Sequence, residues 1–442
     1  MKFAAALMLM LMLPLIACGR VPLDKPEGGE IWAVLVAGSD GWYNYRHQSD
    51  ICHAYQILKA NGIPDDHIVV MMVDDIADND QNPYPGKIIN HPSGDDVYAG
   101  VPKDYAGRHV TVENFFKVLR GDANGLQGIG SGKVINSGPN DRIFINMDDH
   151  GSPGLFCFPH ENMMANDFAK LVKELKQDNK FKEMLVYMES CYSGSMFQDL
   201  FPDDMGFYAL SAASPYESSM AAYCSGPLAT CLGDLFSVSW MEDVESKDPS
   251  TELLKENFEI TRTRTDLSDV LQWGQTSIEN EVVAAFMGGK GSNTSPVKKY
   301  TAEERKATAV PSQDVPLITL QNQLKSAKNL EEKAHLSNEI SALNKRRSLV
   351  KHVMEKIALT VSGDEKLVKE LMTKRQEKIT AWDCYGDAVD AFHNNCFTLG
   401  KSTYALTVVP TLLNMCEAGY STNAIVEATK KVCVFPTMHN AY

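Results

Sequence analysis

A histidine and a cysteine flanked by small residues each follow an apolar segment of this 442-residue chain. His150 and Gly151 come shortly after the run that ends at Met147, and Cys191 comes shortly after the run that ends at Met188. An imidazole beside a thiol can accept its proton and leave a thiolate that attacks a carbonyl group. The backbone N–H groups of Gly151 and Cys191 are candidates for an oxyanion hole. Either motif alone is typical of a structural residue, but the two together indicate nucleophilic catalysis.

The segments that must position these residues alternate between apolar strands and amphipathic helices. Strands are predicted at 31–37, 68–73, 142–147, 183–189 and 206–213, and helices at 49–60, 111–119 and 164–176. This alternation predicts an α/β fold with a mostly parallel sheet that helices cover on both faces. In such sheets ligands bind outside the carboxyl ends of the strands, which is where His150 and Cys191 fall.

The first residues are typical of a secretory signal peptide, because Lys2 precedes an apolar run at 3–16 and then small residues. We place the signal peptide at residues 1–18 and a short N-terminal propeptide at 19–29. A bacterial lipoprotein signal is the alternative, since residues 15–18 fit a lipid-attachment box. The apolar run is short for a bilayer and no second one follows, so we expect no membrane span.

The rest of the chain divides into three parts by composition. An α/β domain is expected at 30–288, an exposed linker rich in Gly, Lys and Pro at 289–316, and an all-α unit at 317–442. Asn293 begins a glycosylation sequon within the linker. The formal net charge of −15 argues against a nucleic-acid partner, because no basic surplus is present to neutralise phosphates.

The cysteines suggest both disulfides and a free thiol. After Cys18 leaves with the signal peptide, the α/β domain keeps an odd number of them, so at least one stays unpaired. These cysteines are Cys52, Cys157, Cys191, Cys224 and Cys231. Whether Cys224 pairs with Cys231 stays open. Four more crowd the last sixty residues and allow three connectivities.

Several stretches closely resemble the legumain family of asparaginyl endopeptidases. They include Gly41 to His47, Asp149-His150-Gly151, Glu189 to Cys191 with Ser193 to Met196, Gly100 to Tyr105, and Trp240 to Asp243. The resemblance covers nearly the whole chain after the signal peptide. It implies a caspase-like α/β peptidase domain followed by an all-α, death-domain-like prodomain.

The resemblance also implies a role for individual residues. Cys191 would be the nucleophile, His150 the general base and Asn44 the residue that orients the histidine. The S1 pocket, which holds the side chain before the scissile bond, would consist of Arg46, His47, Glu189, Ser219 and Asp234. An asparagine carboxamide offers an acceptor oxygen and a donor NH2 group, so it suits a pocket with both kinds of partner. Asp149 matches a position that can cyclise to a succinimide.

Two departures from the family lie beside the site: Tyr192 stands where an acidic residue is common, and Asp148 where a threonine is usual. The family's processing asparagine aligns near Ser326, which leaves Asn322 and Asn329 as candidates. In the tail the resemblance implies the disulfides Cys384–Cys416 and Cys396–Cys433. We hypothesise that this basic helical tail covers an acidic active-site face through salt bridges that weaken as carboxylates protonate.

The sequence therefore predicts a cysteine endopeptidase that cuts after Asn, and after Asp at low pH, made as an acid-activated zymogen. We expect it in the secretory pathway, in a lysosome- or endosome-like compartment or secreted. Its expected partners are protein and peptide substrates, its own prodomain in cis and cystatin-type inhibitors, with no cofactor and no required metal. The alternatives are a peptide ligase or, from another class, an inactive binding protein acting through Arg120-Gly121-Asp122. A lipid-anchor transamidase is disfavoured, because the expected C-terminal membrane span is missing.

Overall fold

The computed structural model describes residues 29–92, 94–225, 228–289, 307–434 and 436–438. The predicted signal peptide, all of the predicted propeptide except Gly29, and the Asn293 sequon lie outside these residues. Within this part of the chain, no helix is long and apolar enough to cross a membrane.

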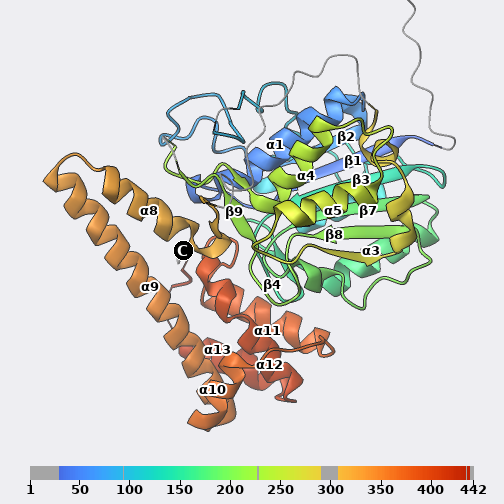
Figure 1. Ribbon diagram of the computed structural model, residues 1–442. Coiled ribbons are helices and arrows are strands. Elements are labelled where there is room, and N and C mark those ends of the chain that lie inside the picture. Colours follow the sequence, from blue (N-terminus) through green and yellow to red (C-terminus); the bar gives the residue numbers. More distant parts are fainter. Residues whose placement is uncertain (1–28, 93, 226–227, 290–306, 435, 439–442) are drawn as a thin grey trace, which may run out of the picture.

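A six-stranded sheet forms the centre of the N-terminal part, in the order β11-β8-β7-β3-β1-β2. Its strands are β1 (Ile31–Ala37), β2 (Ile68–Met71), β3 (Arg142–Asp148), β7 (Glu183–Glu189), β8 (Phe207–Ser211) and β11 (Leu271–Gly274). The first five pair in parallel, and β11 runs antiparallel to β8 at the edge. The predicted α/β fold is confirmed in this arrangement (Figure 1).

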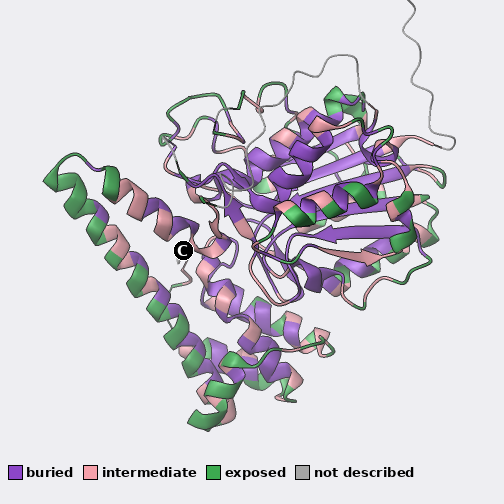
Figure 2. Cartoon of the chain, in the orientation of Figure 1, coloured by how far each residue is buried: buried purple, intermediate pink, exposed green. Residues whose placement is uncertain are grey.

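Helices cover both faces of the sheet because successive strand residues point to opposite sides. One face packs on α1 (Tyr45–Ala60), α4 (Leu235–Ser246) and α5 (Leu254–Arg264), and the other packs on α2 (Val112–Arg120) and α3 (Ala165–Gln177). In β1, Ala33 and Leu35 join the first core, and Val34 and Val36 join the second. The five parallel strands are therefore buried on both sides, whereas the edge strand β11 is half-buried (Figure 2).

The sequence placed the start of α1 four residues too late, at Ser49. A 3-10 turn at Trp42–Asn44 leads into the helix, which begins at Tyr45. Arg46, His47 and Gln48 are completely buried although they are polar. An apolar periodicity cannot detect a helical turn that buries polar side chains.

The Arg120-Gly121-Asp122 tripeptide forms the end of α2. Gly121 caps the helix in the left-handed conformation, with φ of 73°. Arg120 pairs with Glu174 at 2.9 Å, and an Asp122 carboxylate oxygen accepts from the N–H of Gly125 at 2.9 Å. The charged groups of the tripeptide therefore take part in the structure of the helix end, which gives the binding-protein alternative no support.

Two small sheets lie outside the central one, and both flank the site described below. The first has the order β10-β9-β12, with β10 (Gly233–Asp234), β9 (Met220–Ala222) and β12 (Val310–Pro311). The second has the order β4-β5-β6, with β4 (Gly151–Ser152), β5 (Leu155–Cys157) and β6 (Asn162–Met164). A short helix, α6 (Ala284–Met287), ends the N-terminal part.

The C-terminal part is helical, as predicted. It contains α8 (Val315–Ser326), α9 (Leu330–Ser362), α10 (Glu365–Thr373), α11 (Trp382–Asn395), α12 (Pro410–Glu417) and α13 (Thr422–Val432). Disulfides join Cys384 to Cys416 and Cys396 to Cys433, and a third joins Cys224 to Cys231 in the N-terminal part. Leu155 and Cys157 of β5 belong to the same hydrophobic core as these helices, so the two parts pack together.

Part of the segment predicted as an exposed linker is not exposed. Val310 and Pro311 pair with β9, and Ser312 is 2% exposed. Arg347 of α9 clamps the following residues through its bonds to the Gln313 carbonyl and the Asp314 carboxylate, both 2.8 Å. The composition of the segment gave no sign that its backbone would complete a sheet.

Candidate active site

The pairing of two parallel strands brings His150 and Cys191 together. Asp148 at the end of β3 lies opposite Glu189 at the end of β7, so residues two positions further along each chain leave the sheet at the same level. A Cβ atom on Gly151 would lie 2.5 Å from the carbonyl oxygen of Cys191, which places these two backbones in contact. Cys191 and His150 are each 3% exposed. The sequence expectation that strand ends gather these residues agrees with this geometry.

Asn44 fixes which nitrogen of His150 carries the proton. The Asn44 amide donates to the Asp40 carbonyl at 2.9 Å, which leaves its Oδ1 to accept from His150 Nε2 at 2.8 Å. Nε2 therefore holds a hydrogen, and Nδ1 is the nitrogen free to take a further proton. Burial, together with the charge of Arg46, lowers the pKa of His150 well below its usual range, so the ring is neutral.

The Cys191 thiol lies 3.9 Å from the hydroxyl of Ser219. Burial raises the pKa of this thiol above its ordinary value, and its contacts with Ser219 oppose the shift. A buried thiol with a raised pKa stays protonated near neutral pH and needs a base to become a nucleophile. A neutral imidazole at the neighbouring strand end can supply that base.

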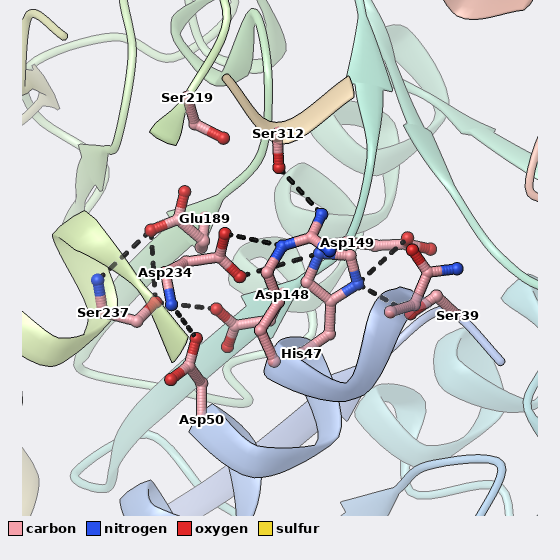
Figure 3. Close-up of polar contacts among 12 residues, drawn as sticks. Ser39, His47, Asp50, Asp148, Asp149, Glu189, Ser219, Asp234, Ser237 and Ser312 are labelled. Atoms are coloured by element: carbon pink, nitrogen blue, oxygen red, sulfur yellow. Dashed lines mark hydrogen bonds and ion pairs between the residues drawn. The ribbon is translucent and has the colours of Figure 1, made fainter. Parts of the chain in front are cut away.

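A buried guanidinium and a buried carboxylate form the floor of the site. Arg46 Nε pairs with Asp234 Oδ1 at 2.9 Å, and both side chains are 0% exposed. Its Nη1 donates to the Tyr43 carbonyl at 2.9 Å, and its Nη2 donates to the hydroxyl of Ser312 at 2.8 Å. Figure 3 shows Ser312, the residue directly after β12, on the side of the site opposite the helix that carries His47 and Asp50. One donor of the guanidinium thus faces a residue of the C-terminal part.

His47 lies between the carboxyl groups of Asp149 and Asp234. Its Nδ1 forms a hydrogen bond with Ser39 Oγ at 2.6 Å and lies 3.6 Å from Asp149 Oδ1. Its Nε2 lies 3.6 Å from Asp234 Oδ2. Its ring meets the ring of His150 edge to face at 4.9 Å. Burial and the neighbouring Arg46 lower the pKa of His47 well below normal, so this ring is also neutral.

Asp149 makes a close contact with the residue after it. Its Oδ1 accepts from the backbone N–H of His150 at 2.6 Å, while the side chain is fully buried. This is the contact from which cyclisation to a succinimide would start. Burial raises the pKa of Asp149 well above its usual range, and a protonated carboxyl is the form that such a reaction requires.

Four carboxyl groups are buried side by side behind the guanidinium. They are Asp50 of α1, Asp148 of β3, Glu189 of β7 and Asp234 of β10. Asp148 accepts from Ser237 at 2.7 Å, and Asp50 accepts from the N–H of Asp234 at 2.9 Å (Figure 3). Because one arginine cannot neutralise four carboxylates, several of them must hold protons at neutral pH.

The same conclusion follows from the pKa of each group. Burial raises the pKa of Asp50, Asp148 and Glu189 well above normal, and it raises that of Asp234 to about 6 even though Arg46 opposes the change. Ligand atoms of Asp50, Asp148 and Asp234 lie within 4.8 Å of one another, as do those of His47, Asp149 and His150. Arg46 pairs directly with the first set, an environment suited to shared protons more than to a cation.

This cluster predicts that the protein is more stable in acid than at neutral pH. A raised pKa in the folded state means that folding binds protons, so stability falls as the pH rises through the folded-state values. We expect Asp148→Asn to be more stable than the wild type at pH 7 by ~1 kcal/mol or more, with a smaller difference at pH 4.5. Thermal unfolding at both pH values measures this, with the exposed Asp203→Asn as the control. The same change in stability for Asp148→Asn at both pH values would contradict a raised pKa of Asp148.

Every residue that the sequence assigned to catalysis or to the S1 pocket lies at this one site. Some participants were missed. Asp50, Ser237 and Ser312 carry no local signal, because tertiary packing alone brings them here. The processing candidates lie elsewhere: Asn322 is within α8 and donates to the Cys224 carbonyl at 3.1 Å, and Asn329 is the N-cap of α9.

The chain is similar to known proteins over most of its length. A model of the peptidase C13 family matches residues 31–289, and a model of the legumain prodomain matches residues 338–433. Human legumain is 43% identical over 419 residues, which cover 94% of this chain and 96% of the human one. Mouse legumain is 42% identical over 439 residues, covering 98% of this chain and 99% of its own.

A plant relative and one solved structure also match. The vacuolar-processing enzyme delta-isozyme of Arabidopsis thaliana is 37% identical over 430 residues, covering 93% of this chain and 91% of its own. The crystal structure of caspase-1 from Spodoptera frugiperda covers 62% of this chain and 99% of its own, with 11% identity and a TM-score of 0.34.

Proposed function

The chain is a cysteine endopeptidase of the peptidase C13 family with a legumain-type prodomain, and we propose that it cleaves peptide bonds after asparagine with Cys191 as nucleophile. The observation that carries the specificity is the buried pair of Arg46 and Asp234 beside the thiol. Such a pair offers a donor and an acceptor in one enclosed place.

The catalytic cycle follows from the positions of His150 and Cys191. His150 Nδ1 takes the thiol proton as Sγ attacks the carbonyl carbon, and the N–H groups of Gly151 and Cys191 stabilise the oxyanion. The imidazolium then gives that proton to the leaving amine, which leaves a thioester on Cys191. Water attacks the thioester with His150 as base, and the acid product leaves as the thiol regains its proton. Asn44 holds the ring in the required tautomer throughout.

The S1 pocket recognises both ends of a carboxamide. The substrate's amide oxygen accepts from Arg46 Nη2, in the place that Ser312 Oγ now takes. Its NH2 group donates to Asp234 Oδ2 and Glu189 Oε1, two buried oxygens that accept no hydrogen bond from the described residues. Aspartate fits only when its carboxyl is protonated and resembles the amide, so its cleavage requires acid.

The same contacts support synthesis as a zymogen inhibited by its own prodomain. β12 occupies the edge of β9 beside Cys191, and the N–H of Ser312 donates to the Ser219 carbonyl at 3.1 Å. A substrate cannot reach Arg46 until this segment moves. The ion pairs Lys378–Asp199 and Lys401–Asp40 join loops between the helices to the peptidase part. The Tyr385 hydroxyl also donates to the Pro153 carbonyl at 2.7 Å, and the Ser152 hydroxyl donates to the Leu406 carbonyl at 3.1 Å, so salt bridges alone do not hold the prodomain.

The proposed function is tested with matched peptides that carry Asn, Asp, Gln or Lys before the scissile bond. After acid incubation of the full chain, we expect a kcat/KM for Asn that exceeds that for Gln and Lys by ~100-fold or more. Asp should be cleaved at pH 4 and not at pH 7. Equal turnover of all four peptides, or a preference for Lys, would overturn the proposal.

Activation is expected to cut after Asn329 in preference to Asn322. Proteases bind extended segments, and Asn329 has φ of −130° and ψ of 164° in the break between α8 and α9, whereas Asn322 lies inside α8. Sequencing the released tail should give Leu330 as its first residue. Asn329→Gln should abolish that fragment, and Asn322→Gln should not. A cut far from both residues would show that another protease activates the chain.

We further propose that the protein works in an acidic compartment of the secretory pathway, where cystatin-type inhibitors would be among its partners. A buried carboxyl cluster that favours the folded state in acid supports this, as do three disulfides. Microscopy of the tagged chain beside a marker of acidic organelles tests the location. A cytosolic distribution would contradict it.

A further inference from the structure

Two segments of the C-terminal part contact the surroundings of Cys191 at different places. β12 and Ser312 occupy the side of the S1 pocket, where the acyl half of a substrate must bind. The second segment, residues 374–379, follows α10. It lines a hollow together with Tyr192 and Ser195, which come shortly after Cys191 in the sequence. The hollow lies beside Tyr192, the residue directly after the nucleophile, and this is where we place the leaving half of a peptide.

The loop at Tyr216 is attached directly to the nucleophile's neighbour. The N–H of Tyr192 donates to the Glu217 carbonyl at 2.7 Å, and Tyr192 itself has a left-handed φ of 58°. This conformation turns the chain immediately after Cys191 and holds the rings of Tyr192 and Tyr216 along one hollow. A peptide attached at Cys191 must pass over this surface.

The second segment binds that surface through a cation and its own backbone. The guanidinium of Arg375 lies 3.8 Å from the centre of the Tyr216 ring. Two residues further on, the Glu377 carbonyl accepts from the Tyr216 hydroxyl at 3.1 Å and from Gln198 Nε2 at 3.2 Å. Lys378 then pairs with Asp199 at 3.4 Å. The segment is therefore held both by its backbone, through the Glu377 carbonyl, and by two cationic side chains, Arg375 and Lys378.

The hollow is larger than the segment fills. A cavity of 360 Å³ remains between the two parts, with Tyr192, Ser195, Pro215 and Tyr216 on the peptidase side and Trp382 and Leu413 on the prodomain side. Once the prodomain leaves, this surface presents two aromatic rings with the Asp199 carboxylate beside them. Aromatic faces and a carboxylate both attract cations.

We propose that Tyr192, Tyr216 and Asp199 form a subsite for the leaving half of the substrate, selective for an arginine or lysine within the first three residues after the scissile bond. Arg375 and Lys378 are the stand-ins for such residues in the zymogen. This inference rests on the proposed function, because it concerns substrates that the same site cleaves. It assigns to Tyr216 a contact with substrate besides its contact with the prodomain.

The experiment compares arginine with citrulline, a neutral side chain of nearly the same shape. Peptides with Asn before the scissile bond carry one or the other at the first, second or third leaving-side position. With the full chain activated by acid, we expect arginine to raise kcat/KM by ~5- to 30-fold at one of these positions. Tyr216→Leu should bring the ratio close to one, and Tyr216→Phe, which keeps the ring, should retain it.

Controls separate the inference from the function on which it rests. Tyr84→Leu changes an exposed tyrosine outside this surface and should keep the arginine preference. Cleavage of all the Asn peptides with no arginine preference would overturn the subsite and leave the proposed function intact. A preference that survives Tyr216→Leu would also overturn it. No cleavage of any Asn peptide would remove the proposed function and this inference with it.

Discussion

Cys191→Ala is expected to lower kcat for an Asn peptide by a factor of about 10,000 or more. The reason is that the covalent path is lost: without Sγ there is no thioester, and His150 has no thiol from which to take a proton. Binding should survive, because Arg46 and Asp234 do not depend on the thiol. Kinetics on the acid-activated protein measure the loss in kcat. Because the variant cannot process itself, both it and the wild type are activated by a second protease.

Cys52→Ala is the matched control. Cys52 is also buried and unpaired, but it lies in α1 against Met72 at 3.8 Å and away from the site. It should retain most of its activity while losing some stability, because a buried side chain is shortened. If Cys191→Ala kept substantial turnover, or if Cys52→Ala lost as much, the assignment of the nucleophile would be wrong.

Arg46→Lys should lower kcat/KM for Asn peptides by roughly 100-fold or more, although the charge is conserved. The guanidinium donates in three directions: to Asp234, to the Tyr43 carbonyl and to the hydroxyl of Ser312, whose place the substrate oxygen takes after activation. An ammonium group cannot reproduce this planar set of donors. The acceptor oxygen of the substrate then loses its donor in a buried pocket, which is costly. Removing the charge altogether would leave Asp234 unpaired among three further carboxyls and endanger the fold.

The measurement for Arg46→Lys is kcat/KM on the Asn and Asp peptides together with thermal unfolding at pH 5. Arg262→Lys, at a side chain 54% exposed, is the control for the substitution itself. A variant that remains folded and cleaves the Asn peptide as well as the wild type would show that Arg46 does not recognise the carboxamide.

The sequence predicted five of the six strands of the central sheet because those five are largely apolar, whereas the short, half-buried edge strand β11 was missed. Buried parallel strands such as 183–189 form near-continuous apolar runs, so their bounds could be placed closely. His150 and Cys191, which follow two neighbouring strands, could then be predicted to lie at one edge of the sheet from the topology alone. Helix α1 was placed too late for the opposite reason, since its first turn buries polar residues that serve the site.

The residues proposed for the S1 pocket came from the family resemblance and could not have come from the pattern of apolar and polar residues. Arg46 and Asp234 are 188 positions apart and meet only because α1 and β10 pack together. Ser312 lies in a segment whose composition indicates an exposed linker. Val310 and Pro311 of this segment pair with β9, a strand formed by residues far away in the sequence. The Arg375–Tyr216 contact likewise joins two surfaces that local sequence does not relate.

Covalent labelling by a peptide chloromethyl ketone that ends in asparagine tests directly whether Cys191 is the nucleophile beside an asparagine pocket. We expect one adduct per acid-activated chain, mapped by mass spectrometry to Cys191, and we expect the glutamine analogue to react far more slowly. Labelling should be suppressed in the full-length chain before activation, while β12 and Ser312 cover the pocket. An adduct on Cys52 or Cys157, or equal rates for the two analogues, would contradict the assignment of Cys191 and of its asparagine pocket.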